Sequence, residues 1–160
     1  MLGILKSGSN EWLSFTRYDD SGRPVLKANP AAITGYDEEL ADLLDYDSGT
    51  GEFEYLRDDD GLIRTMAYDS CSGYISRESV QEGQLGDPIK VREFEYVGCQ
   101  PSSGSSASSS SSSSSSGCPK DNVWFTKKQI VYPSDVDQNK KITTSFSYSF
   151  HAGTCQIAER

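Results

Sequence analysis

The sequence has 160 residues, close to the size of one ordinary domain, and it is acidic: 24 Asp and Glu against 15 Lys and Arg give a formal charge of −9. Only 35% of the residues are hydrophobic, and 13 serines lie between residues 102 and 116, so a large two-layer enzyme core is not expected. The negative charge opposes binding to nucleic acid, no stretch approaches the roughly 20 apolar residues of a membrane span, and residues 1–7 are too short for a signal peptide that would support export.

Short segments in which apolar and polar residues alternate, bounded by Gly, Asp or Ser, predict a mostly β fold of antiparallel strands. Pro24 lies in the second of these segments and favours an edge position for that strand, because proline cannot donate a hydrogen bond to a neighbour. The last two segments are expected to form a hairpin. The expected strands are residues 11–18, 23–27, 52–55, 62–68, 73–78, 89–97, 123–132 and 142–150.

One short helix is expected over residues 36–44. Leu40, Leu43 and Leu44 are at helical spacing, and the acidic residues 37–39 would occupy the first turn, where they favour the helix dipole. The predicted role of this helix is to pack its leucines against the sheet.

A serine- and glycine-rich run divides the chain. Between Pro101 and Cys118 the only apolar residue is Ala107, and such a run is expected to be a disordered loop, because nothing offsets the entropy of ordering it. The sequence therefore predicts a β-rich segment over residues 1–99, a flexible linker over 100–117, and a β-hairpin segment over 118–160 that packs with the first.

A short pattern recurs before the serine run: a tyrosine and an aspartate are followed within a few residues by a glycine. In such a unit the aromatic residue ends one strand, the aspartate hydrogen-bonds to the turn backbone, and the glycine adopts positive φ, so each copy predicts a hairpin turn. A further copy has an arginine in place of the tyrosine. The turn residues are Tyr18, Asp19, Gly22 and Arg23 in the first copy, Tyr46, Asp47 and Gly51 in the second, Asp58 and Gly61 in the copy without tyrosine, and Tyr68, Asp69 and Gly73 in the last.

The first copy, Tyr18 to Arg23, matches the Y-D-x-x-G-R core of YD repeats, so the sequence resembles an RHS/YD-repeat protein over roughly residues 12–96. The amino-acid sequences of residues 12–19 and 132–135, together with the serine-rich insert, are similar to those of very large RHS-like proteins of planctomycete-type bacteria. The resemblance implies a secreted or cell-surface bacterial protein whose repeats wind into a β-sheet spiral, often a shell around a C-terminal toxin. The D-P-x-G signature that ends such a shell is absent here, because Gly86-Asp87-Pro88-Ile89 does not match it.

No complete catalytic or metal-binding motif accompanies the repeats. Asp58, Asp59 and Asp60 form the densest acidic cluster, and adjacent acids in a glycine-terminated turn are typical of solvated turn residues rather than of a tuned acid and base. Residues 135–139 resemble the opening of a calcium loop, but Lys140 at position six and Phe146 at position twelve exclude an EF-hand. The chain has one histidine, and neither G-x-S-x-G nor H-E-x-x-H occurs in the sequence.

The four cysteines, Cys71, Cys99, Cys118 and Cys155, are spaced too widely for a zinc ribbon. They are either free thiols or disulfide-bonded, and a bridge between Cys99 and Cys118 would close the serine-rich loop. Four cysteines allow three pairings, and the spacing does not choose among them.

Taken together, these patterns predict a non-enzymatic structural or interaction segment of an RHS/YD-repeat-like surface or secreted protein, with no cofactor. Its expected partners are neighbouring repeats of a longer chain and polysaccharide or cell-surface material. The alternative is a carbohydrate- or calcium-binding adhesion module, in which an exposed Trp12 or Trp124 would lie beside acids.

Overall fold

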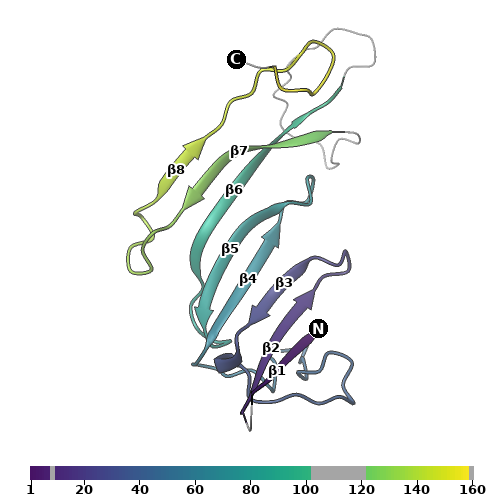
Figure 1. Cartoon of the computed structure of the whole chain (residues 1–160). Helices are drawn as coiled ribbons and strands as arrows, with labels where there is room; N and C mark the ends of the chain where they lie inside the picture. The colour runs from purple at the N-terminus through teal and green to yellow at the C-terminus, as the bar shows by residue number, and fades with distance from the viewer. Residues whose placement is uncertain (8–9, 102–121, 159–160) are drawn as a thin grey trace.

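The computed structural model describes residues 1–7, 10–101 and 122–158, and within them the chain forms one open sheet of eight antiparallel strands in sequence order (Figure 1). The expectation of a mostly β fold is confirmed. The strands are β1 (Leu2–Ser7), β2 (Asn10–Tyr18), β3 (Pro24–Ala28), β4 (Leu62–Tyr68), β5 (Ile75–Glu82), β6 (Ile89–Cys99), β7 (Val123–Val131) and β8 (Ile142–Ser145).

The first expected hairpin is confirmed, with β2 paired to β3 from Phe15–Ala28 to Arg17–Leu26. The edge position expected from Pro24 is wrong, because β3 lies between β2 and β4. Pro24 is tolerated there since it is the first residue of β3 and sits at a shift in register between β2 and β3.

The helix expected over residues 36–44 is wrong: within the described ranges the helical structure is a single 3-10 turn, η1 (Pro30–Ala32). Leu43 has a φ of 68°, which no right-handed helix accommodates. The Asp42 carboxylate accepts hydrogen bonds from the backbone N–H groups of Asp45 and Tyr46, and such local bonds compete with helix formation. Leu44 nevertheless reaches the core, where it is fully buried.

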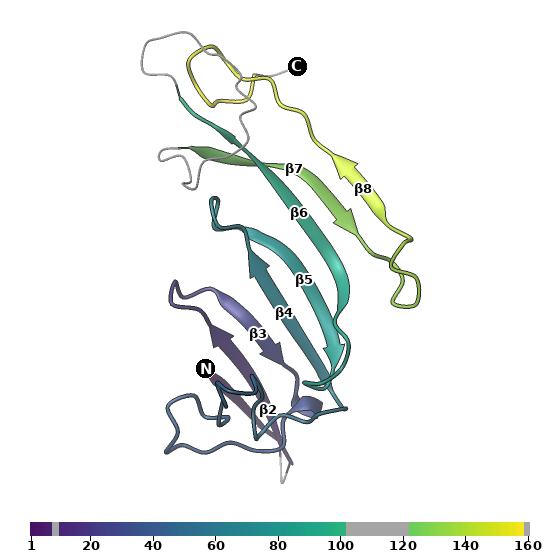
Figure 2. The ribbon, with the colours of Figure 1, turned by 180° about the vertical axis from the view of Figure 1, so that it is seen from behind.

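The strand expected over residues 52–55 is also wrong. Phe53 makes one isolated bridge with Tyr46, and the next two N–H groups bond back to the carbonyls of Asp45 and Leu44. These residues form part of an irregular segment, residues 29–61, that lies at the β1–β2 end of the sheet in both views (Figures 1 and 2).

The hydrophobic core lies between this irregular segment and one face of β2–β4. Phe15 of β2 and Phe53 of the segment meet edge to face with ring centroids 6.3 Å apart. Each fully buried Leu or Ile contributes about 1.5–3 kcal/mol relative to exposure, so this one-sided core stabilises mainly the N-terminal half of the sheet. The buried residues of the core are Phe15, Ala28, Ala32, Ile33, Leu44, Phe53, Leu56 and Ile63.

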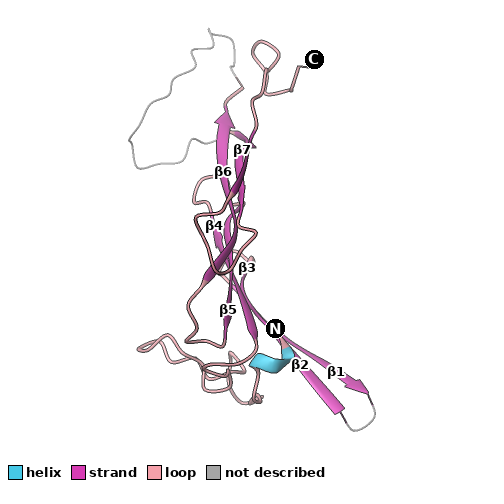
Figure 3. Cartoon of the chain, turned by 90° about the vertical axis from the view of Figure 1, so that its left-hand side faces the viewer, coloured by secondary structure: helices cyan, strands magenta, loops and turns pink. Residues whose placement is uncertain are grey.

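Seen edge-on, the strands form a single layer (Figure 3). The strands expected over 62–68, 73–78, 89–97 and 123–132 correspond to β4 to β7 with end shifts of a few residues, and the hairpin of β7 with β8 is confirmed. The strand over 142–150 ends early, at Ser145, while β1 was not expected at all.

The strands on either side of the serine-rich run pair with each other. β6 pairs with β7 from Arg92–Val131 to Cys99–Val123, so the residues before and after the serine-rich run belong to one sheet. The expected flexible linker lies largely outside the described residues. No helix in the described part of the chain is long and apolar enough to cross a membrane.

Candidate functional site: the turn edge of the sheet

The first repeat turn joins β2 to β3 and is held by Asp19. Its carboxylate accepts hydrogen bonds from the backbone N–H groups of Ser21 and Arg23, both at 2.9 Å. The backbone N–H of Gly22 donates to the Asp19 carbonyl, and Gly22 has a φ of 74°, which favours glycine at this position. The Arg23 guanidinium donates to the same carboxylate and holds the pKa of Asp19 below its ordinary value of 3.8.

The turns at Asp47 and Asp69 share one hydrogen-bond pattern. In each, the aspartate N–H donates to the carbonyl five residues later, and the N–H of the glycine four residues later, Gly51 or Gly73, donates to the aspartate carbonyl. Both glycines have positive φ. The extra residue in these copies, relative to the first, lengthens the turn without changing the role of aspartate or glycine.

The copy at Asp58 and Gly61 behaves differently from its sequence pattern. It joins the irregular segment to β4 and is not a hairpin turn between two neighbouring strands. Gly61 packs against the backbone of Ala31 and Ala32, where a Cβ atom would lie 2.1 Å from the nearest backbone atom. The glycine is required here by close approach, which explains why the copy resembles the others in sequence but not in structure.

The first and last repeat turns contact each other through Arg23. Its guanidinium stacks on the ring of Tyr68, 4.4 Å from the ring centroid, and also donates to the Gly73 carbonyl. The Tyr68 hydroxyl donates in return to the carbonyl of Pro24 at 2.8 Å. The arginine of the first copy and the tyrosine of the last therefore fasten the β2–β3 hairpin to the β4–β5 hairpin.

Tyr68 belongs to a series of three equivalent tyrosines. The hydroxyl of Tyr96 donates to the carbonyl of Ile75 at 2.6 Å, and that of Tyr148 donates to Thr126 at 2.7 Å. The strand register can be extended to the three acceptor residues, Pro24, Ile75 and Thr126. Each of them then lies opposite the residue that precedes the tyrosine. The chain at the end of β4, near the end of β6 and just after β8 is thus tied in the same way to the preceding strand, β3, β5 and β7 respectively. We call Tyr68, Tyr96 and Tyr148 the tyrosine ladder.

The sequence reasoning missed two members of the ladder, because neither Tyr96 nor Tyr148 is followed by aspartate. The signal present in the sequence is a large apolar residue two positions before the tyrosine, as in Met66–Tyr68, Phe94–Tyr96 and Phe146–Tyr148. Burial raises the pKa of both Tyr68 and Tyr96, so both hydroxyls remain protonated donors at neutral pH.

An open groove of about 710 Å³ runs beside the ladder, lined mainly by apolar side chains. Tyr74, Phe94 and Tyr96 contribute rings to it, and Tyr74 is 51% exposed. In the same groove the buried Glu78 accepts a hydrogen bond from Arg92, an ion pair that also raises the pKa of the arginine. The groove therefore offers exposed aromatic surface next to a charged pair.

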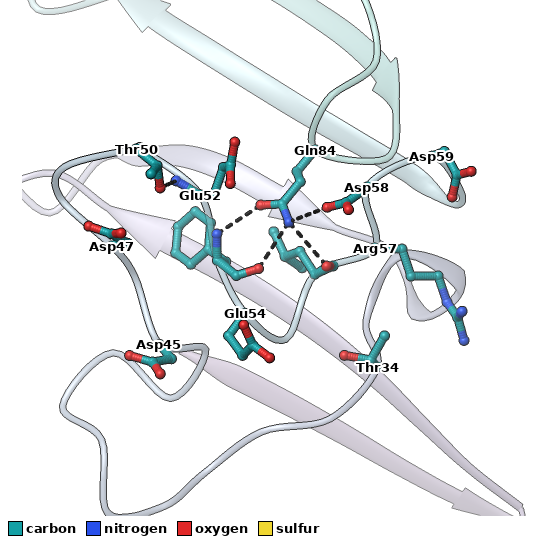
Figure 4. A pocket seen from close by; sticks show the side chains of 12 residues that line it. Thr34, Asp45, Asp47, Thr50, Glu52, Glu54, Arg57, Asp58, Asp59 and Gln84 are labelled. Atoms are coloured by element: carbon teal, nitrogen blue, oxygen red, sulfur yellow. Dashed lines mark hydrogen bonds between the residues drawn. The ribbon is translucent and has the colours of Figure 1, made fainter.

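A second hollow, of about 850 Å³, lies in the irregular segment (Figure 4). The Gln84 side chain closes one side of it by accepting a hydrogen bond from the N–H of Phe53 and donating to the carbonyls of Phe53 and Leu56 and to the Asp58 carboxylate. We call it the acidic hollow. Its lining includes six carboxylates, those of Asp45, Asp47, Glu52, Glu54, Asp58 and Asp59.

Besides its carboxylates, the acidic hollow is lined by the polar side chains of Thr34, Thr50, Arg57 and Gln84. Its lining contains no histidine, cysteine or lysine. Across the described residues no three His, Cys, Asp or Glu side chains are grouped so that they could hold a metal ion. Residues 135–139 form a turn in which the Asp137 carboxylate accepts the N–H of Asn139.

Trp12 is 40% exposed on β2, directly opposite Leu5 of β1. Its cross-strand neighbour is therefore apolar rather than acidic. Trp124 is half-buried at the start of β7, opposite Gly98.

Cys99 forms a disulfide with Cys155, the two Cα atoms being 5.8 Å apart. Cys99 therefore bonds Cys155, and the Cys99–Cys118 bridge, one of the possibilities that the sequence left open, is wrong. The chain after β8 packs Tyr148 and Phe150 against Phe125 of β7 and so brings residue 155 to the end of β6. Cys118 lies outside the described residues, Cys71 is also disulfide-bonded, and no described cysteine is a free thiol.

Comparison with family models, with curated proteins and with solved structures finds no match to this chain.

Proposed function

We propose that this chain is a non-enzymatic structural segment of an RHS/YD-repeat-like surface or secreted protein, in which hairpins stack side by side. The observation that carries the proposal is the repeated tie between consecutive strands by the tyrosine ladder, with Arg23 of the Y-D-x-x-G-R turn stacked on Tyr68. Units of this kind cannot bury a face alone and gain stability from their neighbours.

The disulfides support the extracellular part of the proposal. Bridges such as Cys99–Cys155 form and persist in oxidising compartments, whereas the reducing cytosol keeps most thiols free. A bridge across 56 residues also suits a segment that has little hydrophobic core at its C-terminal end.

The proposal is tested on the purified chain with panels of glycoside, ester and peptide substrates and with a glycan array. We expect no turnover. Turnover that disappears in a single Asp59→Asn or Glu78→Gln variant with unchanged folding would refute the structural role. The flanking reading frame gives an independent test, because a repeat segment is expected to lie beside further Y-D-x-x-G units.

A second candidate function is carbohydrate binding in the groove beside the ladder. The exposed ring of Tyr74 next to Phe94 and the Glu78–Arg92 pair favours it, because sugar rings stack on aromatic faces while charged groups bind hydroxyls. A single sugar bound tightly by the wild-type chain, and lost in Tyr74→Ala, would favour this function over the purely structural one. The calcium-binding alternative has no group of ligands to which it can be assigned in the described residues.

A further inference from the structure

Two exposed cations lie side by side on the face of β3 and β4 that points away from the core. Lys27 of β3 faces Arg64 of β4 directly across the strand pair, and both are exposed. Their neighbours along each strand, Ala28 and Ile63, point into the core, so the two cations point to the opposite face. Figure 3 shows the strands there as a single layer.

Neither cation has an acidic partner among the residues that the structure describes. No hydrogen bond, ion pair or ring contact within the described chain involves the side chain of Lys27 or of Arg64, and the residues that flank them in the same row are Thr16 and Val80. Like charges directly opposite each other in a sheet are destabilising, and their Cβ atoms are only about 4.5–5.5 Å apart. In a chain of net charge −9, two adjacent free cations on an open face are suited to an anionic occupant.

The same chain carries a complementary surface on its other side. None of the six carboxylates of the acidic hollow forms an ion pair with Lys or Arg of the described residues, and the hollow is concave, with about 850 Å³ of space. Glu52 and Glu54 are exposed, and their side chains make no hydrogen bond in the described structure (Figure 4). The long side chains of Lys27 and Arg64, by contrast, project from exposed positions of β3 and β4.

We propose that the Lys27–Arg64 pair of one copy docks into the acidic hollow of a second copy. The two surfaces lie on opposite sides of the same region, so the contact is heterologous and each added copy leaves one surface of each kind open. The proposal goes beyond the proposed function and does not rest on it. A scaffold segment can be monomeric, and a self-associating chain need not be a YD-repeat protein.

The test is sedimentation velocity of the full, oxidised chain over a range of concentrations. We expect association at low ionic strength that weakens at least about tenfold towards 1 M salt, because the Debye length then falls from about 30 Å to about 3 Å. The variants Lys27→Glu/Arg64→Glu and Glu52→Lys/Glu54→Lys should each be monomeric. An equimolar mixture of the two should associate again, because the unchanged hollow of the first variant then meets the unchanged Lys27–Arg64 pair of the second.

The control variant is Lys127→Glu/Lys141→Glu, which changes the net charge by the same amount at exposed positions of β7 and the β7–β8 loop. It should associate like the wild type. Far-UV circular dichroism checks folding, and Lys27→Gln/Arg64→Gln replaces the reversed variant if that variant does not fold. The proposal is overturned if the wild type is monomeric throughout, if the control loses association equally, or if the mixture stays monomeric. Binding of polygalacturonate by a monomeric wild type, lost in the Lys27/Arg64 variant, would overturn it in favour of an acidic polysaccharide.

Discussion

Removing the hydroxyl groups of the tyrosine ladder should weaken the fold by a similar amount at each step. Tyr→Phe keeps the ring and deletes one part-buried hydrogen bond to a backbone carbonyl, at 2.8 Å for Tyr68, 2.6 Å for Tyr96 and 2.7 Å for Tyr148. Such a bond contributes about 0.5–1.5 kcal/mol net, so each variant should lose about 1 kcal/mol. The three contacts share no partner, and the triple variant should therefore lose about 3 kcal/mol.

Tyr18 provides the matched control. It ends β2 as Tyr68 ends β4, but its hydroxyl has no hydrogen-bond partner in the described structure. Tyr18→Phe should consequently change the free energy of unfolding by close to zero.

Urea unfolding followed by tryptophan fluorescence measures these differences. With a slope of about 1–3 kcal/mol per molar urea, each ladder variant should move the midpoint by roughly 0.3–1 M. If Tyr18→Phe costs as much as Tyr96→Phe, or if the triple variant costs less than about 1 kcal/mol, the hydroxyl bonds do not fasten consecutive strands and the argument for the ladder fails.

Three further predictions concern other contacts. Gln84→Ala removes the hydrogen bonds that hold the irregular segment and should lower the free energy of unfolding by about 2–4 kcal/mol. Hydrogen exchange at the Phe53 amide should become faster. The same exchange rate as in a Gln129→Ala control would contradict this prediction. Replacing Cys99 and Cys155 together by serine should lower stability by up to about 4 kcal/mol on chain-entropy grounds, and an unchanged melting temperature would speak against this. Arg23 lowers the pKa of Asp19 in the folded chain, so the stability from this carboxylate is present above about pH 4 and is lost as the pH falls through the folded pKa. Asp19→Asn should therefore flatten the pH dependence of the urea midpoint. An unaltered pH dependence would refute the role assigned to Asp19.

The local features of the fold could be predicted from the sequence. Alternation identified β4 over residues 62–68, and the Asp19 and Gly22 pair located the first hairpin turn, because both signals act between residues close together in the chain. The spacing of Leu40, Leu43 and Leu44, also a local signal, predicted a helix that does not form. Their spacing reports only that apolar residues are to be buried, while the Asp42 carboxylate and the positive φ of Leu43 decide the backbone.

The remaining features depend on contacts between distant residues. Cys99 and Cys155 meet because the segment after β8 folds back along β7, and no spacing rule gives that path. The Arg23–Tyr68 stack joins residues separated by a whole irregular segment. The candidate site was therefore predictable as a set of turns, but its connections between hairpins were not.

The strand order has a consequence for how the molecule is made. Every strand pairs with the strand that precedes it in the chain, so each pairing closes a short loop, apart from the two connections interrupted by residues 29–61 and by the serine-rich run. Chains rich in such local pairings fold quickly, and they can add structure from the N-terminus while the rest is still being synthesised. Each new hairpin pairs with the edge strand of the sheet that has already formed. Such a sheet can therefore be lengthened by duplication of one hairpin without disturbing the earlier ones.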